Sequence, residues 1–211
     1  MVSIFTLIVG IIATCIILWL LELYFSFPII VDLLVCYLIV FFLMYFSTLI
    51  NVHKTRNINK LEKFFKKHRK HPFYRFLYAV SNNDEKEMIE SYRKMMKQKK
   101  FQRLYPLVTI IFSLSFHKTM GLYEEIENLK QSYLKKYYRA LVLIEDKQLI
   151  EARSIAKTIK RDWAREALYS EIELREGKKE AAKRHAKIAM KHSRGLRYYL
   201  LKKEYERKYS L

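Results

Sequence analysis

The chain has 211 residues, of which 40 are Lys or Arg and 21 are Asp or Glu, so its net charge near neutral pH is +19. The basic residues are unevenly placed, because none occurs before residue 54. Both cysteines lie in that same front segment, which excludes a disulfide framework or a cysteine-ligated zinc site in the rest of the chain.

The front segment, residues 1–53, contains two apolar runs at 4–21 and 33–50, neither of which has an internal charge. At about 1.5 Å per residue in a helix, each run is long enough to cross most of a hydrocarbon core about 30 Å thick. The stretch between them carries Pro28 and the only two charged residues of the segment. We therefore predict a two-helix transmembrane hairpin whose turn lies at one membrane interface.

The charges that follow predict an orientation for this hairpin. Eight basic residues occur between residues 54 and 70, opposed only by Glu62. The positive-inside rule places such a segment in the cytoplasm. With two crossings, the N-terminus and everything after residue 53 are then cytoplasmic, and we expect a multi-pass protein of the cell membrane.

Residues 54–71 form a basic, amphipathic connector, which has two interpretations. Apolar residues share one helical face, and lysines spread over the remainder. In the first interpretation the helix lies on anionic lipid headgroups. Its membrane-surface residues would be Lys60, Lys63, Phe64, Lys66 and Lys67. In the second, the connector is the first helix of the following domain and packs its Phe side chains on Phe73 and Phe76.

Residues 72–211 are predicted to be helical throughout, because glycine and proline are sparse and no strand-length alternation repeats. We expect apolar first helices at 73–80, 104–116, 137–144 and 163–174. The second helices carry apolar stripes with offsets of three or four residues: Met88, Tyr92 and Met95; Leu122, Ile126 and Leu129; Ala152, Ala156 and Ile159; Ala182, Ala186 and Ala189. Successive stripes are 34, 30 and 30 residues apart.

Such a helical hairpin cannot bury its own apolar face, so neighbouring hairpins must stack. We therefore predict an all-α chain whose hairpin anchor is followed by a cytoplasmic α-solenoid of about four helix-turn-helix units. Residues 195–211 lack a partner helix and are predicted to be a capping helix with a wet outer face. An irregular helical bundle with evenly spaced hairpins is the alternative within the same class.

One second helix carries a family resemblance. Gly177 followed by Ala182, Ala186 and Ala189 resembles the second helix of a tetratricopeptide repeat. The resemblance implies a tetratricopeptide-like array at 72–211. The layout of two spans, a basic connector and helical repeats is similar to that of HemY-type membrane proteins.

Catalytic chemistry is not indicated by the sequence. His68 and His71, and likewise His185 and His192, are spaced to share a helix face, but no cysteine or obvious carboxylate completes either pair. No glycine-rich phosphate loop occurs. We expect a protein that is not an enzyme and that needs no cofactor or metal.

The charge balance after residue 53, with 40 basic and 19 acidic residues, favours an acidic partner. Our leading hypothesis is a membrane-anchored adaptor that binds a partner protein in a basic, helix-lined groove. Arg139, Arg165 and Tyr138 are the predicted partner-binding residues. Two alternatives remain open. One is RNA or DNA binding through patches of lysine and tyrosine, and the other is an accessory subunit that joins a membrane complex through its spans.

Overall fold

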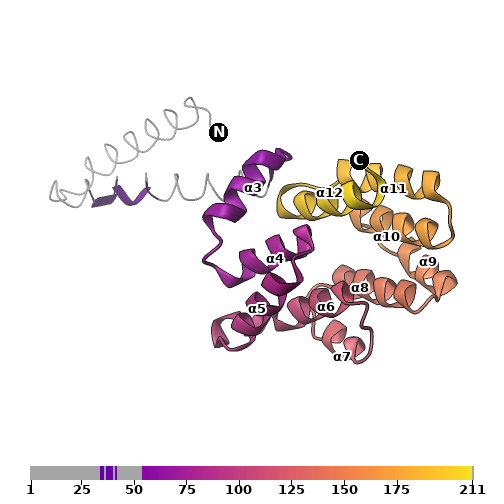
Figure 1. The fold of residues 1–211 in the computed structure, drawn as a ribbon, viewed down its shortest axis with the longest axis horizontal. Helices are drawn as coiled ribbons and strands as arrows, with labels where there is room; N and C mark the ends of the chain where they lie inside the picture. The colour runs from indigo at the N-terminus through magenta and orange to yellow at the C-terminus, as the bar shows by residue number, and fades with distance from the viewer. Residues whose placement is uncertain (1–33, 36, 40, 42–53, 211) are drawn as a thin grey trace, which may run out of the picture. The chain divides into compact units, whose positions relative to one another are not determined.

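The computed structural model describes residues 34, 35, 37–39, 41 and 54–210 (Figure 1). The chain divides into two compact units, residues 1–55 and 56–211, and the second unit carries the elements discussed below. All regular structure in the described residues is helical, and no strand occurs among them. The prediction of an all-α class is confirmed.

The prediction of a transmembrane hairpin has to be corrected. No helix in the described part of the chain is both long enough and apolar enough to cross a bilayer. The longest of them, with 15 residues, extends about 22 Å against a core of about 30 Å. The predicted spans at 4–21 and 33–50 lie outside the described residues, apart from six residues between 34 and 41. The membrane anchor, the cell-membrane location and the cytoplasmic placement are therefore withdrawn.

Four helical hairpins occupy most of residues 54–210, as Figure 1 shows. The helices are α3 Ile58–Lys67, α4 Pro72–Asn82, α5 Glu85–Met96, α6 Tyr105–Ser115, α7 Leu122–Glu127, α8 Ser132–Glu145, α9 Leu149–Lys157, α10 Asp162–Arg175, α11 Lys179–Lys191 and α12 Gly195–Tyr209, with a 3₁₀ helix η1 at Lys99–Leu104. The hairpins are α4–α5, α6–α7, α8–α9 and α10–α11, and the two helices of each pack on one another. These are the four first-and-second helix pairs predicted from the sequence.

Local sequence explains where several of these helices begin. Asp84 precedes α5, and its side-chain oxygen accepts a hydrogen bond from the N–H of Glu87 at 2.9 Å. Asn57 caps α3 in the same way through the N–H of Lys60 at 3.1 Å. Pro72 occupies the first position of α4, where its missing N–H costs nothing.

The turn of every hairpin uses one repeated hydrogen-bond pattern. A residue with positive φ follows the first helix by one or two positions, and these residues are Asn83, His117, Lys147 and Gly177. The N–H groups of Asp84, Lys118, Gln148 and Lys178 then donate to the carbonyl oxygens of Ala79, Ser113, Leu143 and Glu173, at 2.8 to 3.0 Å. This is the Schellman motif. The four residues are 34, 30 and 30 positions apart, the same intervals as the apolar stripes, so the repeat is a backbone repeat as well.

Apolar burial follows the predicted stripes. Ala152, Ala156 and Ile159 of the third hairpin are at most 2% exposed, and they join a core formed by α8, α9 and α10. In the fourth hairpin Ala186 and Ala189 are fully buried. Small side chains on α11 let it approach α10 closely, which is the reason for alanine at those positions.

Helix α12 contacts both the last and the first helices of the array. We predicted a cap with one wet face, but α12 packs on α11 and also on α3 and α4 at the start of the series (Figure 1). Tyr199 and Tyr205 are buried there, and the Tyr199 ring lies 4.8 Å from the Phe65 ring. The Arg207 guanidinium donates to the backbone oxygen of Ser81 in α4. The last hairpin is thereby tied to the first.

The connector helix α3 packs on the following helices, as in the second of its two predicted interpretations, but among the described residues its Phe rings meet Tyr74, Tyr78 and Tyr199 and make no ring contact with the predicted partners Phe73 and Phe76. Leu61 and Phe65 are buried, and Phe64 is 9% exposed, with its ring edge-on to Tyr74 at 5.0 Å. Phe64 is therefore a core residue and not a membrane-surface residue. Of the other residues predicted for a membrane surface, Lys60, Lys63, Lys66 and Lys67 are exposed. Lys66 pairs with Glu62 at 3.0 Å.

Candidate anion-binding site

The two arginines predicted to bind a partner already have carboxylate partners within the chain. Arg139 forms an ion pair with Glu127 at 2.7 Å, and Glu127 also pairs with Lys135 at 3.2 Å. Arg165 lies 2.7 Å from Asp162 and 3.4 Å from Glu166. An acidic ligand would have to displace these carboxylates. The structure also keeps the two arginines apart, because Arg139 lines a cavity against α9 while Arg165 belongs to the first turn of α10.

Tyr138, the third predicted residue, is partly buried beside the core. It packs against the buried cluster formed by α6, α7 and α8, and its ring lies 5.3 Å from that of Tyr137. Burial raises the pKa of the Tyr138 hydroxyl above its ordinary value. A ring held in this way cannot serve as a stacking platform for a ligand.

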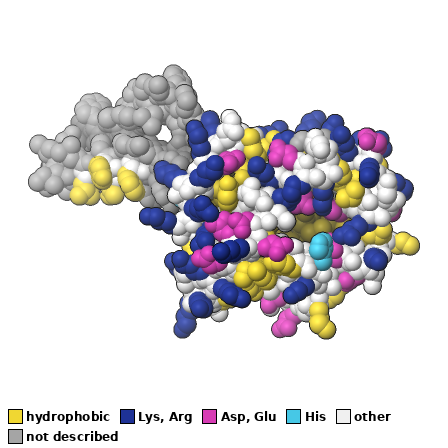
Figure 2. Space-filling model, viewed as in Figure 1, with side chains coloured by type: hydrophobic (Ala, Val, Ile, Leu, Met, Phe, Trp, Pro, Cys, Tyr) yellow, Lys and Arg dark blue, Asp and Glu magenta, His cyan; other side chains and the backbone are white. Residues whose placement is uncertain are grey.

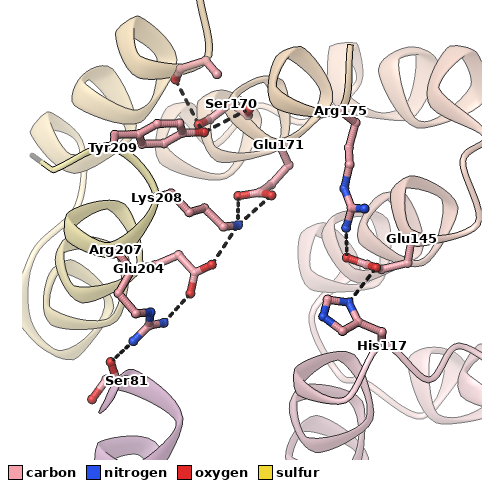
Figure 3. A network of polar contacts seen from close by, with 11 residues as sticks. Ser81, His117, Glu145, Ser170, Glu171, Arg175, Glu204, Arg207, Lys208 and Tyr209 are labelled. Carbon is pink, nitrogen blue, oxygen red and sulfur yellow. Dashed lines mark hydrogen bonds and ion pairs between the residues drawn. The ribbon is translucent and has the colours of Figure 1, made fainter. Parts of the chain in front are cut away.

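A network of ion pairs and one hydrogen bond to a backbone carbonyl joins α4, α10 and α12, and its cations are paired within the network (Figure 3). Lys208 lies 2.7 Å from Glu171 and 2.8 Å from Glu204. Glu204 also accepts from Arg207 at 2.9 Å. Burial opposes the charged form of Lys208, but the two carboxylates outweigh it and raise its pKa. For Glu204 burial is likewise outweighed, by Lys208 and Arg207, so its pKa is lowered.

The second group of residues in Figure 3 is also paired internally. Glu145 accepts a hydrogen bond from Arg175 at 2.7 Å and lies 3.0 Å from His117. On the face that Figure 2 draws, a hollow has a hydrophobic floor, and basic and acidic side chains are mixed around it. Charges that neutralise one another do not select an acidic ligand. A site for an acidic ligand therefore requires cations that have no carboxylate partner within the chain.

Such cations converge on a cavity of about 360 Å³ at the junction of α8, α10 and α12. The cavity is lined by Tyr133, Lys160, Arg161, Asp162, Trp163, His192 and Arg197. Lys160 and Arg161 come from the loop that ends at the first residue of α10, and Arg197 comes from the first turn of α12. Two segments that are more than 30 residues apart in the sequence thus place three cations around one cavity.

None of the three long cations of this cavity, Lys160, Arg161 and Arg197, has a carboxylate partner among the residues that the structure describes. The one acid in the lining, Asp162, lies 2.7 Å from Arg165 and 3.7 Å from His192. Burial and the neighbouring Arg161 cation lower the pKa of Arg197. An arginine remains charged even so, and a bound anion would offset that unfavourable field.

Aromatic rings hold the two guanidinium groups in place. The Cζ atom of Arg197 lies 4.2 Å from the centroid of the Trp163 ring, and that of Arg161 lies 5.6 Å from the centroid of Tyr133. The two rings meet edge to face, with centroids 6.4 Å apart. A guanidinium that lies over a ring keeps its N–H edge available for hydrogen bonds to an anion. The arrangement is therefore organised before a ligand arrives.

Sequence reasoning missed this pocket as a unit. None of Lys160, Arg161 and Arg197 was among the predicted partner-binding residues. The available signal was local: a Lys160-Arg161 pair directly before Asp162-Trp163 at the start of a helix. What the sequence lacked was the closure by α12, which brings Arg197 beside Trp163.

The histidines require a second correction. We expected His185 and His192 to lack carboxylate partners, but His185 faces Glu166 at 2.7 Å and His192 faces Asp162 at 3.7 Å. These pairs join α11, or the segment that follows it, to α10 and orient the imidazole rings. Within the described residues no group of three or more His, Cys, Asp or Glu side chains is placed to hold a metal ion.

A second basic surface lies along α5. Lys86, Arg93, Lys94 and Lys97 line a shallow cavity of about 440 Å³ together with Ile89 and Glu90. The four cations form no ion pair with any described carboxylate, whereas Glu90 pairs with Arg75 at 2.8 Å. The four cations lie in a row, and among the described residues none of them lies over an aromatic ring as Arg197 does.

No family model, no curated protein and no solved structure matches this chain. Its function is therefore inferred from the described residues themselves. Unpaired cations distinguish the pocket around Arg197 from the surroundings of Arg139 and Arg165, and the aromatic rings beneath its guanidinium groups distinguish it from the α5 surface.

Proposed function

We propose that residues 56–210 form a non-catalytic binding module, an adaptor that holds an acidic segment of a partner protein. Its anchor is the pocket of Lys160, Arg161 and Arg197. The observation that carries the proposal is the convergence of these three cations on one cavity without a described carboxylate partner. By contrast, Arg139 and Arg165 are already paired.

The energetics favour this pocket over the paired arginines. A hydrogen bond to a charged group contributes about 1.5–3 kcal/mol, and an arginine fork binds a carboxylate with two such bonds. Where a carboxylate of the chain already binds the guanidinium, a ligand has to replace it, and most of the free energy of the new hydrogen bonds is cancelled by the loss of the old ones. The stacking of Arg197 on Trp163 also removes side-chain freedom beforehand, which lowers the entropic cost of binding.

The test is a binding titration of the full chain with a fluorescein-labelled, glutamate-rich peptide, followed by fluorescence anisotropy at 150 mM salt. We expect Arg197→Ala and Arg161→Ala each to weaken binding about tenfold, the factor that corresponds to about 1.4 kcal/mol. Arg139→Ala is the matched control, because its guanidinium is occupied by Glu127. It should change the affinity less than about twofold. Equal losses in all three variants, or no binding at this salt concentration, would refute the proposal.

A second candidate function is suggested by the unpaired cations of α5. Lys86, Arg93, Lys94 and Lys97 present a positive track that suits the phosphate backbone of a nucleic acid. Stacking on bases is not part of this candidate, because Tyr199 is buried and Tyr138 is partly buried beside the core.

Filter binding with single-stranded RNA tests this candidate. Replacement of Lys94 and Lys97 with Glu should weaken binding regardless of base sequence. It should also reduce the slope of log affinity against log salt concentration by the amount that corresponds to about two phosphate contacts. Reversal of Lys187, an exposed lysine of α11, serves as the control. If reversal of Lys187 is equally damaging, the binding is a general effect of net charge and the α5 surface is not its site.

A further inference from the structure

The pocket around Arg197 carries more positive charge than one carboxylate requires. A carboxylate has a single negative charge and is satisfied by one guanidinium fork. The cavity offers two forks, from Arg161 and Arg197, and the ammonium group of Lys160. Its only acid, Asp162, is directed to Arg165 and His192. The surplus matches an anion with a larger charge and more acceptor atoms.

We propose that this pocket recognises a phosphomonoester, carried as a phosphorylated side chain on the acidic segment of the partner protein. The inference rests on the proposed adaptor function and specifies its ligand. A phosphomonoester carries a charge of about −1.5 to −2 at neutral pH and has three terminal oxygens. Those three oxygens correspond to the three donor groups of the pocket.

The geometry fits a single phosphate better than a chain of phosphates. The two guanidiniums lie over different rings, Trp163 and Tyr133, and these rings are edge to face with a centroid distance of 6.4 Å. The donors therefore approach one cavity from two directions and do not follow a line. A nucleic acid backbone needs a track of cations, which the α5 surface supplies and this cavity does not.

Three labelled peptides that differ at one central residue test the inference with the full chain. The central residue is serine, glutamate or phosphoserine, and the flanking residues are acidic in all three. At pH 7.4 the phosphoserine peptide should bind about tenfold more tightly than the glutamate peptide. The advantage should shrink as the pH falls through about 6, because the phosphate then becomes a monoanion. Inorganic phosphate at millimolar concentration should compete with the phosphopeptide.

The variants locate the effect. Arg197→Lys keeps the charge and removes the fork, so it should reduce the tenfold advantage to about threefold or less, and Arg161→Ala should do the same. Arg139→Ala, the matched control, should retain the full advantage. Lys160, Arg161 and Arg197 are all exposed, so none of these substitutions removes a core side chain, and Arg161→Ala and Lys160→Ala keep the test valid if the circular dichroism of an Arg197 variant shows a folding defect.

The outcomes separate this inference from the proposed function. Equal affinity for the glutamate and phosphoserine peptides, with both sensitive to Arg197, would overturn the phosphate inference and leave the adaptor in place. A phosphate advantage that survives in Arg197→Lys and Arg161→Ala would place phosphate recognition elsewhere and overturn the assignment of this pocket. Failure of all three peptides to bind would remove both proposals.

Discussion

Replacing Lys147 with glycine is expected to stabilise the protein, whereas replacing Gly177 with alanine is expected to destabilise it. Both residues follow the first helix of a hairpin and lie in the left-handed region, with φ of +63° at Lys147 and +78° at Gly177. They occupy equivalent positions in the third and fourth Schellman motifs. Only Gly177 suits that conformation without a steric cost.

The magnitude follows from two opposing terms. A side chain in the left-handed region costs about 1–2 kcal/mol. Glycine, however, gives the unfolded chain additional freedom worth about 0.4–1 kcal/mol. The net gain for Lys147→Gly is then about 0.5–1 kcal/mol. For Gly177→Ala the loss is similar, because a Cβ atom there would meet nothing within 4 Å and adds no clash of its own.

Thermal unfolding followed by circular dichroism at 222 nm measures both effects. In a protein of this size, 1 kcal/mol corresponds to a Tm shift of about 2–4 °C. We expect Tm to rise in Lys147→Gly, to fall in Gly177→Ala and to return near the starting value in the double variant, because the two residues lie in the turns of different hairpins and their effects should add. A lower Tm in Lys147→Gly would refute the assignment of a repeated left-handed turn.

Two further predictions concern the closure by α12. Lys208→Met should destabilise the fold by about 1–2 kcal/mol near pH 7, because it leaves Glu171 and Glu204 facing one another, and Lys187→Met is the control. The lowered pKa of Glu204 means that its charge stabilises the fold above about pH 4.5 and stops doing so as the pH falls. The difference in Tm between Lys208→Met and the parent should therefore shrink as the pH is lowered below about 4.5, and a constant difference would contradict this explanation. Tyr199→Phe should stabilise the fold by about 1 kcal/mol, because it removes a buried hydroxyl that has no hydrogen-bond partner among the described residues, whereas Tyr199→Ala should cost about 3–5 kcal/mol.

Local pattern was sufficient to predict the hairpins. The apolar stripes recur with the same intervals as the turn residues, so the positions of α5, α7, α9 and α11 could be read from the sequence. The turn at His117 could not, because a histidine with φ of +54° has no sequence signature comparable to that of Gly177. Whether the hairpins belong to the tetratricopeptide class stays a prediction.

Tertiary closure was the part that the sequence could not supply. Nothing in residues 195–211 indicates that Tyr199 contacts Phe65 of α3, since the two residues are more than 130 positions apart. The ion pairs were also invisible, because they depend on which faces meet. Arg139 and Arg165 were good candidates by residue type, but their guanidinium groups form ion pairs with Glu127 and Asp162. The predicted membrane anchor depended on composition alone, and the described helices include none able to span a bilayer.

Trp163 allows the most direct test of the central claim, that the unpaired cations beside it form the ligand site. It is one of two tryptophans in the chain, and the Arg197 guanidinium lies over its ring. Titration with the phosphoserine peptide should give a saturable change in tryptophan emission, with the same midpoint as the anisotropy titration. The change should be lost in Trp163→Phe and in Arg197→Ala. An emission change that persists in Trp163→Phe, or tight peptide binding without any change in the parent protein, would contradict the account.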